Sequence, residues 1–285
     1  MCRMAVYRGP AIPLKQVIYS PSHNFIRLAQ KPREMVAAPL NGDGFGLGWY
    51  NQSLSSEPAL ITSEKPLWHD INLPRISDKI LSDTIFMHVR AASPGLPVHQ
   101  ANSHPFQWEN LLFMHNGVVS DFRKGFLRAL RERIADPFYE NIQGTTDSEH
   151  VFGYYLTLLS QSDSRDLAAT MITLIDHLNS MAVTRNTDLV LNLAVTDGKT
   201  VVITRYTNIE KSASLYYASQ SKYFPGGIIA ASEKLYTDDD SWTEFPLNQQ
   251  LVIAADGSWS FQALPNPFFV EGILTRKAKP STLLA

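Results

Sequence analysis

Strand patterns on both sides of a helical block constrain the fold of this 285-residue chain more than any other feature. Short alternating apolar runs bounded by turn residues predict strands over residues 2–8, 45–50, 84–89 and 111–115. The first strand is expected to stop at Pro10 and Pro13. The pattern returns over residues 189–196, 200–205, 215–218, 228–231 and 250–254, where Asp-Gly turns separate some of the runs.

Between these two groups, apolar residues recur at helical spacing over residues 122–134, 152–159 and 167–178. Strands before and after the helices favour two packed, mostly antiparallel sheets with helices outside, rather than alternating βαβ units. The predicted fold class is therefore α+β. The length fits one domain over residues 2–265, and residues 266–285, which contain Pro and Lys, are expected to form a tail.

Charge and composition argue against several classes of protein. A net charge of -2 gives no long-range basic field, so we expect no nucleic-acid partner. The densest basic run lacks alternating aromatic residues and is interpreted as a solvated helix face; it consists of Arg123, Lys124, Arg128, Arg131 and Arg133. No apolar run approaches the ~18 residues that span a bilayer, and no signal-peptide pattern opens the chain. We therefore expect a cytoplasmic protein with no membrane partner.

Neither a metal nor another cofactor is expected. The glycines at 42, 44, 46 and 48 do not fit the dinucleotide-binding pattern G-x-G-x-x-G, and the 8 histidines include no H-E-x-x-H. Cys2 is the single cysteine of the chain, which excludes an internal disulfide. Whatever this side chain does, it does as a thiol or a thiolate.

The position of Cys2 suggests an N-terminal nucleophile. Cysteine is small enough for Met1 to be removed, and removal would give Cys2 a free α-amino group. The thiol and its base would then share one residue, which is a known way to activate a nucleophile. Taken alone, a cysteine at position 2 is better explained by chance, so the hypothesis depends on partner residues.

Two segments at predicted strand ends supply candidate partners. Arg90 suits an anchor for a carboxylate, because its guanidinium can donate two parallel hydrogen bonds. The ordinary alternative for Arg90 is a surface ion pair. Asn116 and Gly117 can direct a side-chain amide and a backbone N–H at one oxygen and so form an oxyanion hole, whereas the ordinary alternative is an Asn-Gly turn.

A third candidate is Asp147, at the start of a predicted helix. Thr146 and Glu149 fit a capping box, which leaves the Asp147 carboxylate free to receive an ammonium group. The alternative is an ordinary first-turn aspartate that complements the helix dipole.

Short motifs in a fixed order resemble the class II glutamine amidotransferase family. They are Cys2-Arg3-Met4, Asn41-Gly42-Asp43-Gly44-Phe45-Gly46, His88-Val89-Arg90, Asn102-Ser103-His104-Pro105-Phe106, Phe113-Met114-His115-Asn116-Gly117 and Thr146-Asp147-Ser148-Glu149. They are most similar to stand-alone members, namely the amidotransferase-like subunit of the fungal glutathione-degrading complex and the ergothioneine-pathway γ-glutamyl hydrolase. The stretch Ala231-Ser232-Glu233 is also similar to the family, but the sequence assigns it no chemical role.

The resemblance implies the four-layer αββα fold of the N-terminal nucleophile (Ntn) hydrolases and a small-molecule γ-glutamyl substrate. It implies these roles: Cys2 as nucleophile, Asn116 and Gly117 as oxyanion hole, Arg90 for the α-carboxylate, Asp147 for the α-ammonium group, and Ser93 as a further substrate contact.

The activity implied is cysteine-dependent hydrolysis of a γ-glutamyl amide, in glutamine or in a γ-glutamyl peptide or conjugate, through a glutamyl thioester. The chain has no room for a synthase domain, so one alternative is a glutaminase subunit that delivers ammonia to a separate synthase partner. An alternative of another class is a non-catalytic γ-glutamyl-binding or scaffold subunit.

Overall fold

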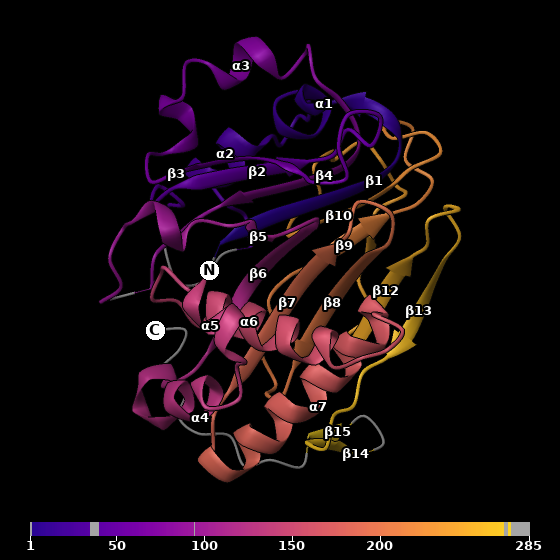
Figure 1. Cartoon of the computed structure of the whole chain (residues 1–285). Coiled ribbons are helices and arrows are strands. Elements are labelled where there is room, and N and C mark those ends of the chain that lie inside the picture. Colours follow the sequence, from indigo (N-terminus) through magenta and orange to yellow (C-terminus); the bar gives the residue numbers. More distant parts are fainter. Residues whose placement is uncertain (1, 35–39, 94, 271–272, 275–285) are drawn as a thin grey trace.

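Two antiparallel sheets pack face to face at the centre of the computed structural model, which describes residues 2–34, 40–93, 95–270 and 273–274 (Figure 1). The seven-stranded sheet has the order β11 (Thr243–Glu244), β9 (Tyr216–Ala218), β10 (Ile228–Ala231), β1 (Arg3–Pro13), β4 (Leu81–Val89), β2 (Phe45–Trp49) and β3 (Ala59–Ser63). The six-stranded sheet has the order β13 (Trp259–Ala263), β12 (Gln249–Ile253), β8 (Val201–Thr207), β7 (Leu189–Thr196), β6 (Leu111–Val119) and β5 (Phe106–Trp108).

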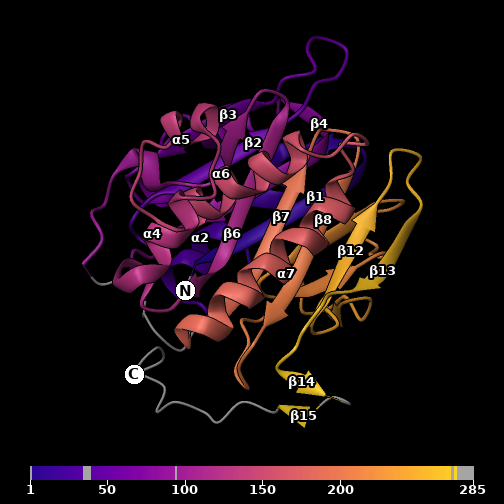
Figure 2. The ribbon, with the colours of Figure 1, turned by 60° about the horizontal axis from the view of Figure 1, so that its bottom comes forward.

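Helices cover the outer face of each sheet. The seven-stranded sheet packs against α1 (Leu14–Ile18) and α2 (Phe25–Gln30), and the six-stranded sheet packs against α6 (Asp147–Ser160) and α7 (Leu167–Arg185) (Figure 2). The shorter elements are η1 (Leu67–His69), α3 (Leu73–Ile76), η2 (Gln100–Asn102), η3 (Phe122–Phe126), α4 (Leu127–Arg131), α5 (Asp136–Glu140), β14 (Phe269–Val270) and β15 (Ile273–Leu274). The predicted four-layer αββα arrangement is confirmed.

The alternation of side chains along β1 shows how the layers form. Successive strand residues point to opposite faces of a sheet. Met4 and Val6 accordingly belong to the apolar cluster between the two sheets, whereas Ala5 and Tyr7 pack on the helical side. By the same alternation, Arg3 falls on the helical side, and Cys2, two residues before Met4, falls on the inward face.

The first strand is longer than predicted. Pro10 does not end β1, which continues to Pro13. Its pairing with β4 shifts register between Arg8 and Ile12, and its pairing with β10 ends at Arg8. Proline is tolerated here because the missing N–H falls at an irregularity and on a free edge.

The helix predicted over residues 122–134 is broken. Lys124 and Gly125, inside η3, have non-helical dihedral angles, with φ of 107° at Gly125, and they kink the segment before α4 begins. Glycine adopts this positive φ without the steric cost that a side chain would bring. Two cations of the basic run are paired with acids on the same segment, Lys124 with Asp121 and Arg128 with Glu132.

The start of the predicted tail contacts the body of the protein. The Asn266 amide donates to the Thr207 carbonyl at 2.8 Å, and Phe268 joins the cluster beneath α7. Residues 271–272 and 275–285 lie outside the described residues, so the boundary at residue 265 stays a prediction. None of the helices in the described part of the chain has the length and apolar composition of a membrane span.

Two buried histidines predict acid sensitivity. His88 of β4 is 0% exposed, and its ring centroid lies 4.4 Å from that of His104. Burial, helped by the charge of Arg90, lowers the pKa of His88 to about 3. The unfolded chain therefore binds a proton at higher pH than the folded chain does, and stability falls as pH drops below about 6.5.

We expect His88→Gln to reduce the slope of unfolding free energy against pH by about 1.4 kcal/mol per pH unit between about pH 4 and 6. Chemical denaturation at several pH values measures this slope. The exposed His69→Gln is the matched control and should leave it unchanged. An unchanged slope in His88→Gln would show that His88 takes up a proton in the folded protein.

Candidate active site

Cys2 lies where the central strand of the seven-stranded sheet begins. Arg3 pairs with Val89, the last residue of β4, and this register puts Cys2 beside the chain that leaves β4. The Ala91 N–H donates to the Cys2 Sγ at 3.4 Å, and the thiol donates to the Ala91 carbonyl at 3.6 Å. The cysteine side chain is half-buried and held against the backbone of a single residue, Ala91.

The surroundings of Cys2 favour the neutral thiol. Burial raises the pKa of the thiol above its ordinary value, although the Ala91 N–H and the charge of Arg90 act to lower it. The thiolate is the reactive form of cysteine. A nucleophile at this place therefore depends on a nearby base.

Arg90 is buried without an acidic partner. It is 3% exposed, its N–H donates to the Gly44 carbonyl at 2.8 Å, and its guanidinium donates to the carbonyls of Asp43 and Pro97 at 3.4 and 3.3 Å. None of the ion pairs found across the described ranges involves Arg90. The Asp43 carboxylate is nearby and accepts the Ala92 N–H at 2.8 Å. A buried guanidinium held only by carbonyls is suited to an incoming carboxylate.

Asn116 and Gly117 lie inside a strand, not at its end. β6 continues to Val119 and pairs Asn116 with Asn192 of β7, so the predicted strand end and the turn alternative are both wrong. Pairing with a strand distant in the sequence overrides the local turn signal. The Asn116 Nδ2 donates to the Ser232 Oγ at 3.0 Å, and Oδ1 has no partner among the described residues. Gly117 is required because a Cβ there would collide with the Val190 carbonyl.

Asp147 begins α6, but its carboxylate is not free as predicted. Oδ2 accepts the Val119 N–H at 2.8 Å, and Oδ1 accepts the N–H and hydroxyl of Ser148 at 2.8 and 3.2 Å. A carboxylate has about four lone-pair sites, so acceptor capacity remains on Oδ2. These bonds fasten the start of α6 to the end of β6, and thereby bring Asp147 close to the strand of Asn116.

The predicted capping box forms only in part. Thr146 Oγ1 accepts the Glu149 N–H at 3.2 Å, as predicted. The Glu149 carboxylate instead accepts the N–H groups of Gln143 and Gly144 at 2.9 and 2.7 Å. The loop before the helix folds back, so its N–H groups reach this carboxylate in place of the Thr146 N–H.

Ser93 is separate from this network. It is exposed, and its carbonyl accepts the Leu96 N–H at 3.0 Å. Its hydroxyl makes no hydrogen bond with another residue of the part described here, and the neighbouring Pro94 lies outside that part. The role of Ser93 stays a prediction.

Ser232 and Glu233, to which the sequence assigned no role, hold the N-terminal strand from opposite faces. On the inner face, Ser232 Oγ accepts the Met4 N–H at 3.0 Å as well as the Asn116 amide. On the outer face, Glu233 Oε1 lies 3.2 Å from Arg3 Nε, and Oε2 lies 2.9 Å from His23 Nε2. The sequence signal for this contact was the stretch Ala231-Ser232-Glu233, in which a serine and a glutamate follow a fully apolar strand.

The Arg3–Glu233 pair is buried on both sides, at 0% and 1% exposed. Burial raises the pKa of Glu233, but hydrogen bonds from His23 and the Arg33 N–H, with the charge of Arg3, lower it, and the net shift is downward. The pair is therefore ionised in the interior, and Arg3 Nη2 has no hydrogen-bond partner among the described residues.

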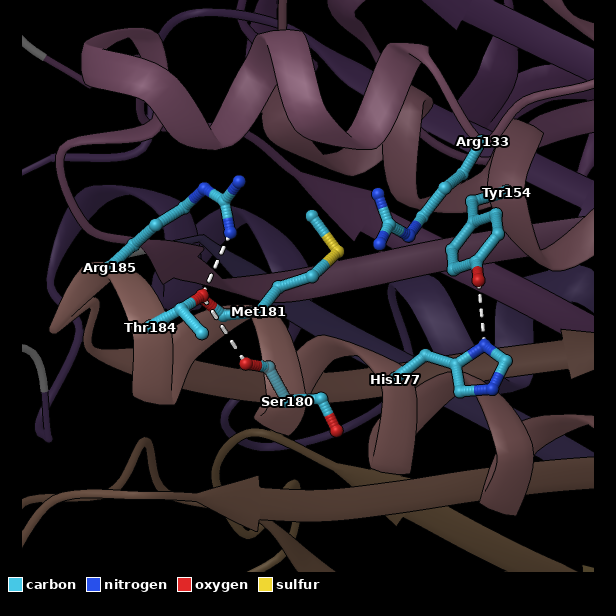
Figure 3. Close-up of a pocket in the computed structure, with 7 residues that line it drawn as sticks. All are labelled: Arg133, Tyr154, His177, Ser180, Met181, Thr184 and Arg185. Atoms are coloured by element: carbon cyan, nitrogen blue, oxygen red, sulfur yellow. Dashed lines mark hydrogen bonds between the residues drawn. The ribbon is translucent and has the colours of Figure 1, made fainter.

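A pocket of about 680 Å³ opens on the helical layer (Figure 3). Its walls come from α6, α7 and the segment after α4: Arg133, Tyr154, His177, Ser180, Met181, Thr184 and Arg185. The Tyr154 hydroxyl is hydrogen-bonded to His177 Nδ1 at 2.6 Å. Because α6 and α7 cover the outer face of the six-stranded sheet, this sheet separates the pocket from Cys2, which faces the space between the sheets.

The fold and the arrangement around Cys2 agree with a known family. A family model described as glutamine amidotransferases class-II matches residues 16–224, which is more than half of the chain. The chain therefore belongs to the class II glutamine amidotransferases, as the resemblance of its motifs indicated. The matched residues include Arg90, Asn116, Gly117 and Asp147, whereas Cys2 and Ser232 lie outside the match.

Two curated relatives and a solved structure are similar over most of the chain. The probable glutamine amidotransferase DUG3 of Saccharomyces cerevisiae is 34% identical over 293 residues, covering 89% of this chain and 82% of the relative. The gamma-glutamyl-hercynylcysteine sulfoxide hydrolase of Mycolicibacterium smegmatis is 25% identical, covering 90% and 96%. A glutamine aminotransferase class-II domain protein from Silicibacter pomeroyi superposes with a TM-score of 0.67 at 26% identity, covering 93% of this chain and 100% of that structure.

The buried pair predicts a strong dependence of stability on Glu233. We expect Glu233→Gln to lower the free energy of unfolding by about 3–5 kcal/mol, because it leaves the Arg3 charge buried without its counter-charge. Urea denaturation followed by circular dichroism measures the change.

The matched control is Glu132→Gln, which breaks the exposed pair with Arg128 (side chains 61% and 89% exposed). This change should cost no more than about 0.5 kcal/mol. Equal effects of the two substitutions would show that the buried pair does not fasten the N-terminal strand.

Proposed function

We propose that the chain hydrolyses a γ-glutamyl amide bond, with Cys2 as the nucleophile once Met1 has been removed. The observation that carries the proposal is the continuity of contacts around Cys2. The Ala91 N–H donates to its Sγ beside the buried Arg90, which has no acidic partner among the described residues, and its strand is joined through Ser232 to Asn116. The similarity to the gamma-glutamyl-hercynylcysteine sulfoxide hydrolase supports the substrate class.

The glutamyl end of the substrate would be held by opposite charges. Arg90 receives the α-carboxylate in a bidentate hydrogen-bonded pair. The Asp147 carboxylate receives the α-ammonium group with its remaining acceptor capacity. Fixing this end places the γ-carbonyl near the Cys2 sulfur, which makes the attack effectively unimolecular.

The α-amino group of Cys2 supplies the base that the buried thiol needs. It takes the thiol proton, the sulfur attacks the γ-carbonyl carbon, and the carbonyl oxygen becomes an oxyanion. The Asn116 amide and the Gly117 N–H donate to that oxyanion. The protonated α-amine then gives its proton to the departing nitrogen, the carbon–nitrogen bond breaks, and a glutamyl thioester remains. Water, deprotonated by the same amine, attacks the thioester and releases glutamate and the thiol.

A glutaminase subunit that passes ammonia to a separate synthase is the second candidate, since it uses the same site up to the thioester. The family name favours it, because amidotransferases use the amide nitrogen of glutamine. A chain whose glutaminase activity rises sharply when a synthase partner is added would support this alternative over free hydrolysis. A non-catalytic γ-glutamyl-binding or scaffold subunit is the remaining alternative, and it predicts binding without turnover.

We expect the active protein to begin at Cys2 and to release glutamate from at least one γ-glutamyl compound. Intact-mass measurement tests the first point, and incubation with glutamine, glutathione and other γ-glutamyl compounds tests the second. Cys2→Ala should abolish release while it keeps ligand binding, because only the nucleophile is lost. Normal turnover by Cys2→Ala would overturn the proposal, and binding without turnover by the wild type would favour the scaffold alternative.

Arg90 should act mainly on substrate binding. Arg90→Lys keeps the charge but removes the planar pair of donors, so we expect KM for the best substrate to rise about tenfold to a hundredfold. Steady-state kinetics measure the change, with the exposed Arg75→Lys as the control that should match the wild type. An unchanged KM in Arg90→Lys would exclude Arg90 as the carboxylate anchor.

A further inference from the structure

Ser232 joins the candidate nucleophile to the candidate oxyanion donor through a single hydroxyl group. Its side chain is fully buried, at 0% exposed. The Oγ accepts the Met4 N–H and the Asn116 Nδ2–H, both at 3.0 Å. The Ser232 N–H donates in turn to the Met4 carbonyl at 2.9 Å. Ser232 is thereby tied to the strand that begins just after Cys2 and to the amide of Asn116.

The contact with Ser232 uses some of the donors and acceptors of these groups and leaves others unused. A serine hydroxyl has two lone pairs, and the two N–H groups occupy both. The Asn116 amide has two N–H donors, of which Ser232 takes one and the other is left for a ligand. The Ser232 O–H is itself a donor, so the hydroxyl alone does not choose between the two orientations of the amide. In the structure the amide lies with Nδ2 toward Ser232, and this bond holds Asn116 in the orientation that leaves one N–H for a ligand.

The backbone of β1 brings the same hydroxyl near the N-terminal end. Backbone groups of alternate strand residues point to the same neighbouring strand. Met4 directs its N–H and carbonyl at Ser232, so Cys2, two residues earlier, directs its own nitrogen to the β10 side. One side chain thus joins Asn116 to the backbone of Met4, two residues after Cys2.

We propose that Ser232 is a positioning residue that holds the Asn116 amide with its N–H toward the oxyanion and in fixed register with Cys2. This proposal rests on the proposed γ-glutamyl hydrolysis. Ser232 touches neither the substrate nor the reacting atoms and acts through Asn116. The gain belongs to the transition state, because the negative oxygen forms only there.

The test is a double-mutant cycle on the full chain, with glutamate release as the assay. Ser232→Ala should lower kcat about tenfold to a hundredfold with KM within about twofold, because one oxyanion donor loses its orientation. Asn116→Ala should lower kcat at least as much. Adding Ser232→Ala to Asn116→Ala should then cause little further loss, since the residue through which Ser232 acts is already absent.

Ser82→Ala is the matched control for loss of a buried serine from the same sheet. Ser82 is 2% exposed and its Oγ accepts the N–H groups of Tyr50 and Thr84 at 3.2 and 3.1 Å, away from the candidate site. Ser82→Ala should lower the free energy of unfolding and leave kcat unchanged. If Ser232→Ala does not yield folded protein, Ser232→Cys takes its place. A thiol is a weaker acceptor than a hydroxyl, so Ser232→Cys should lower kcat by a smaller factor and leave KM unchanged.

The outcomes separate the two proposals. A wild-type chain that releases no glutamate, or a Cys2→Ala variant that does, overturns the proposed function and the role of Ser232 with it. Wild-type turnover that depends on Cys2, together with full kcat in Ser232→Ala or with independent losses in the double variant, overturns the role of Ser232 alone. A fall in kcat at constant KM that disappears in the Asn116→Ala background supports it.

Discussion

The burial of the N-terminal strand in the middle of a sheet is the constraint on which the rest of the site depends. β1 lies between β4 and β10, so hydrogen bonds hold both of its edges. The Arg3–Glu233 pair fastens its outer face and Ser232 its inner face. Chain ends usually fray. Here the first described residues are among the most constrained, which gives Cys2 a fixed position relative to both neighbouring strands.

The proposed site would bring charged and polar groups from both halves of the fold to the thiol. Arg90 directly follows β4 of the seven-stranded sheet, and Asn116 lies on β6 of the six-stranded sheet. Asp147 belongs to the helical layer beyond, but its bond to the Val119 N–H attaches it to the strand of Asn116. Burial costs free energy for a guanidinium that only carbonyls hold and for an amide with an unused donor. Under the proposed function, the zwitterionic glutamyl group of the substrate would supply partners for both groups.

Much of this arrangement could be predicted from the sequence, and what could not has a common physical reason. Cys2, Arg90, Asn116 and Asp147 lie in short local motifs, and the order of strands and helices indicated two sheets with helices outside. The strand end at Asn116 and the free carboxylate at Asp147 were wrong, because pairing and capping contacts are made by distant segments. Ser232 and Met4 are 228 positions apart, so no local pattern joins them. Strands as short as β5 and β11 lack a readable period and were missed.

The central claim is that Cys2, as the first residue of the active chain, attacks a γ-glutamyl carbonyl. The most direct measurement is acid quenching during turnover, followed by peptide mass spectrometry of the N-terminal segment. The account predicts a peptide that begins at Cys2, carries one glutamyl group on sulfur and loses that group to hydroxylamine, as a thioester does. A glutamyl group on another residue, or an active chain that retains Met1, would contradict it.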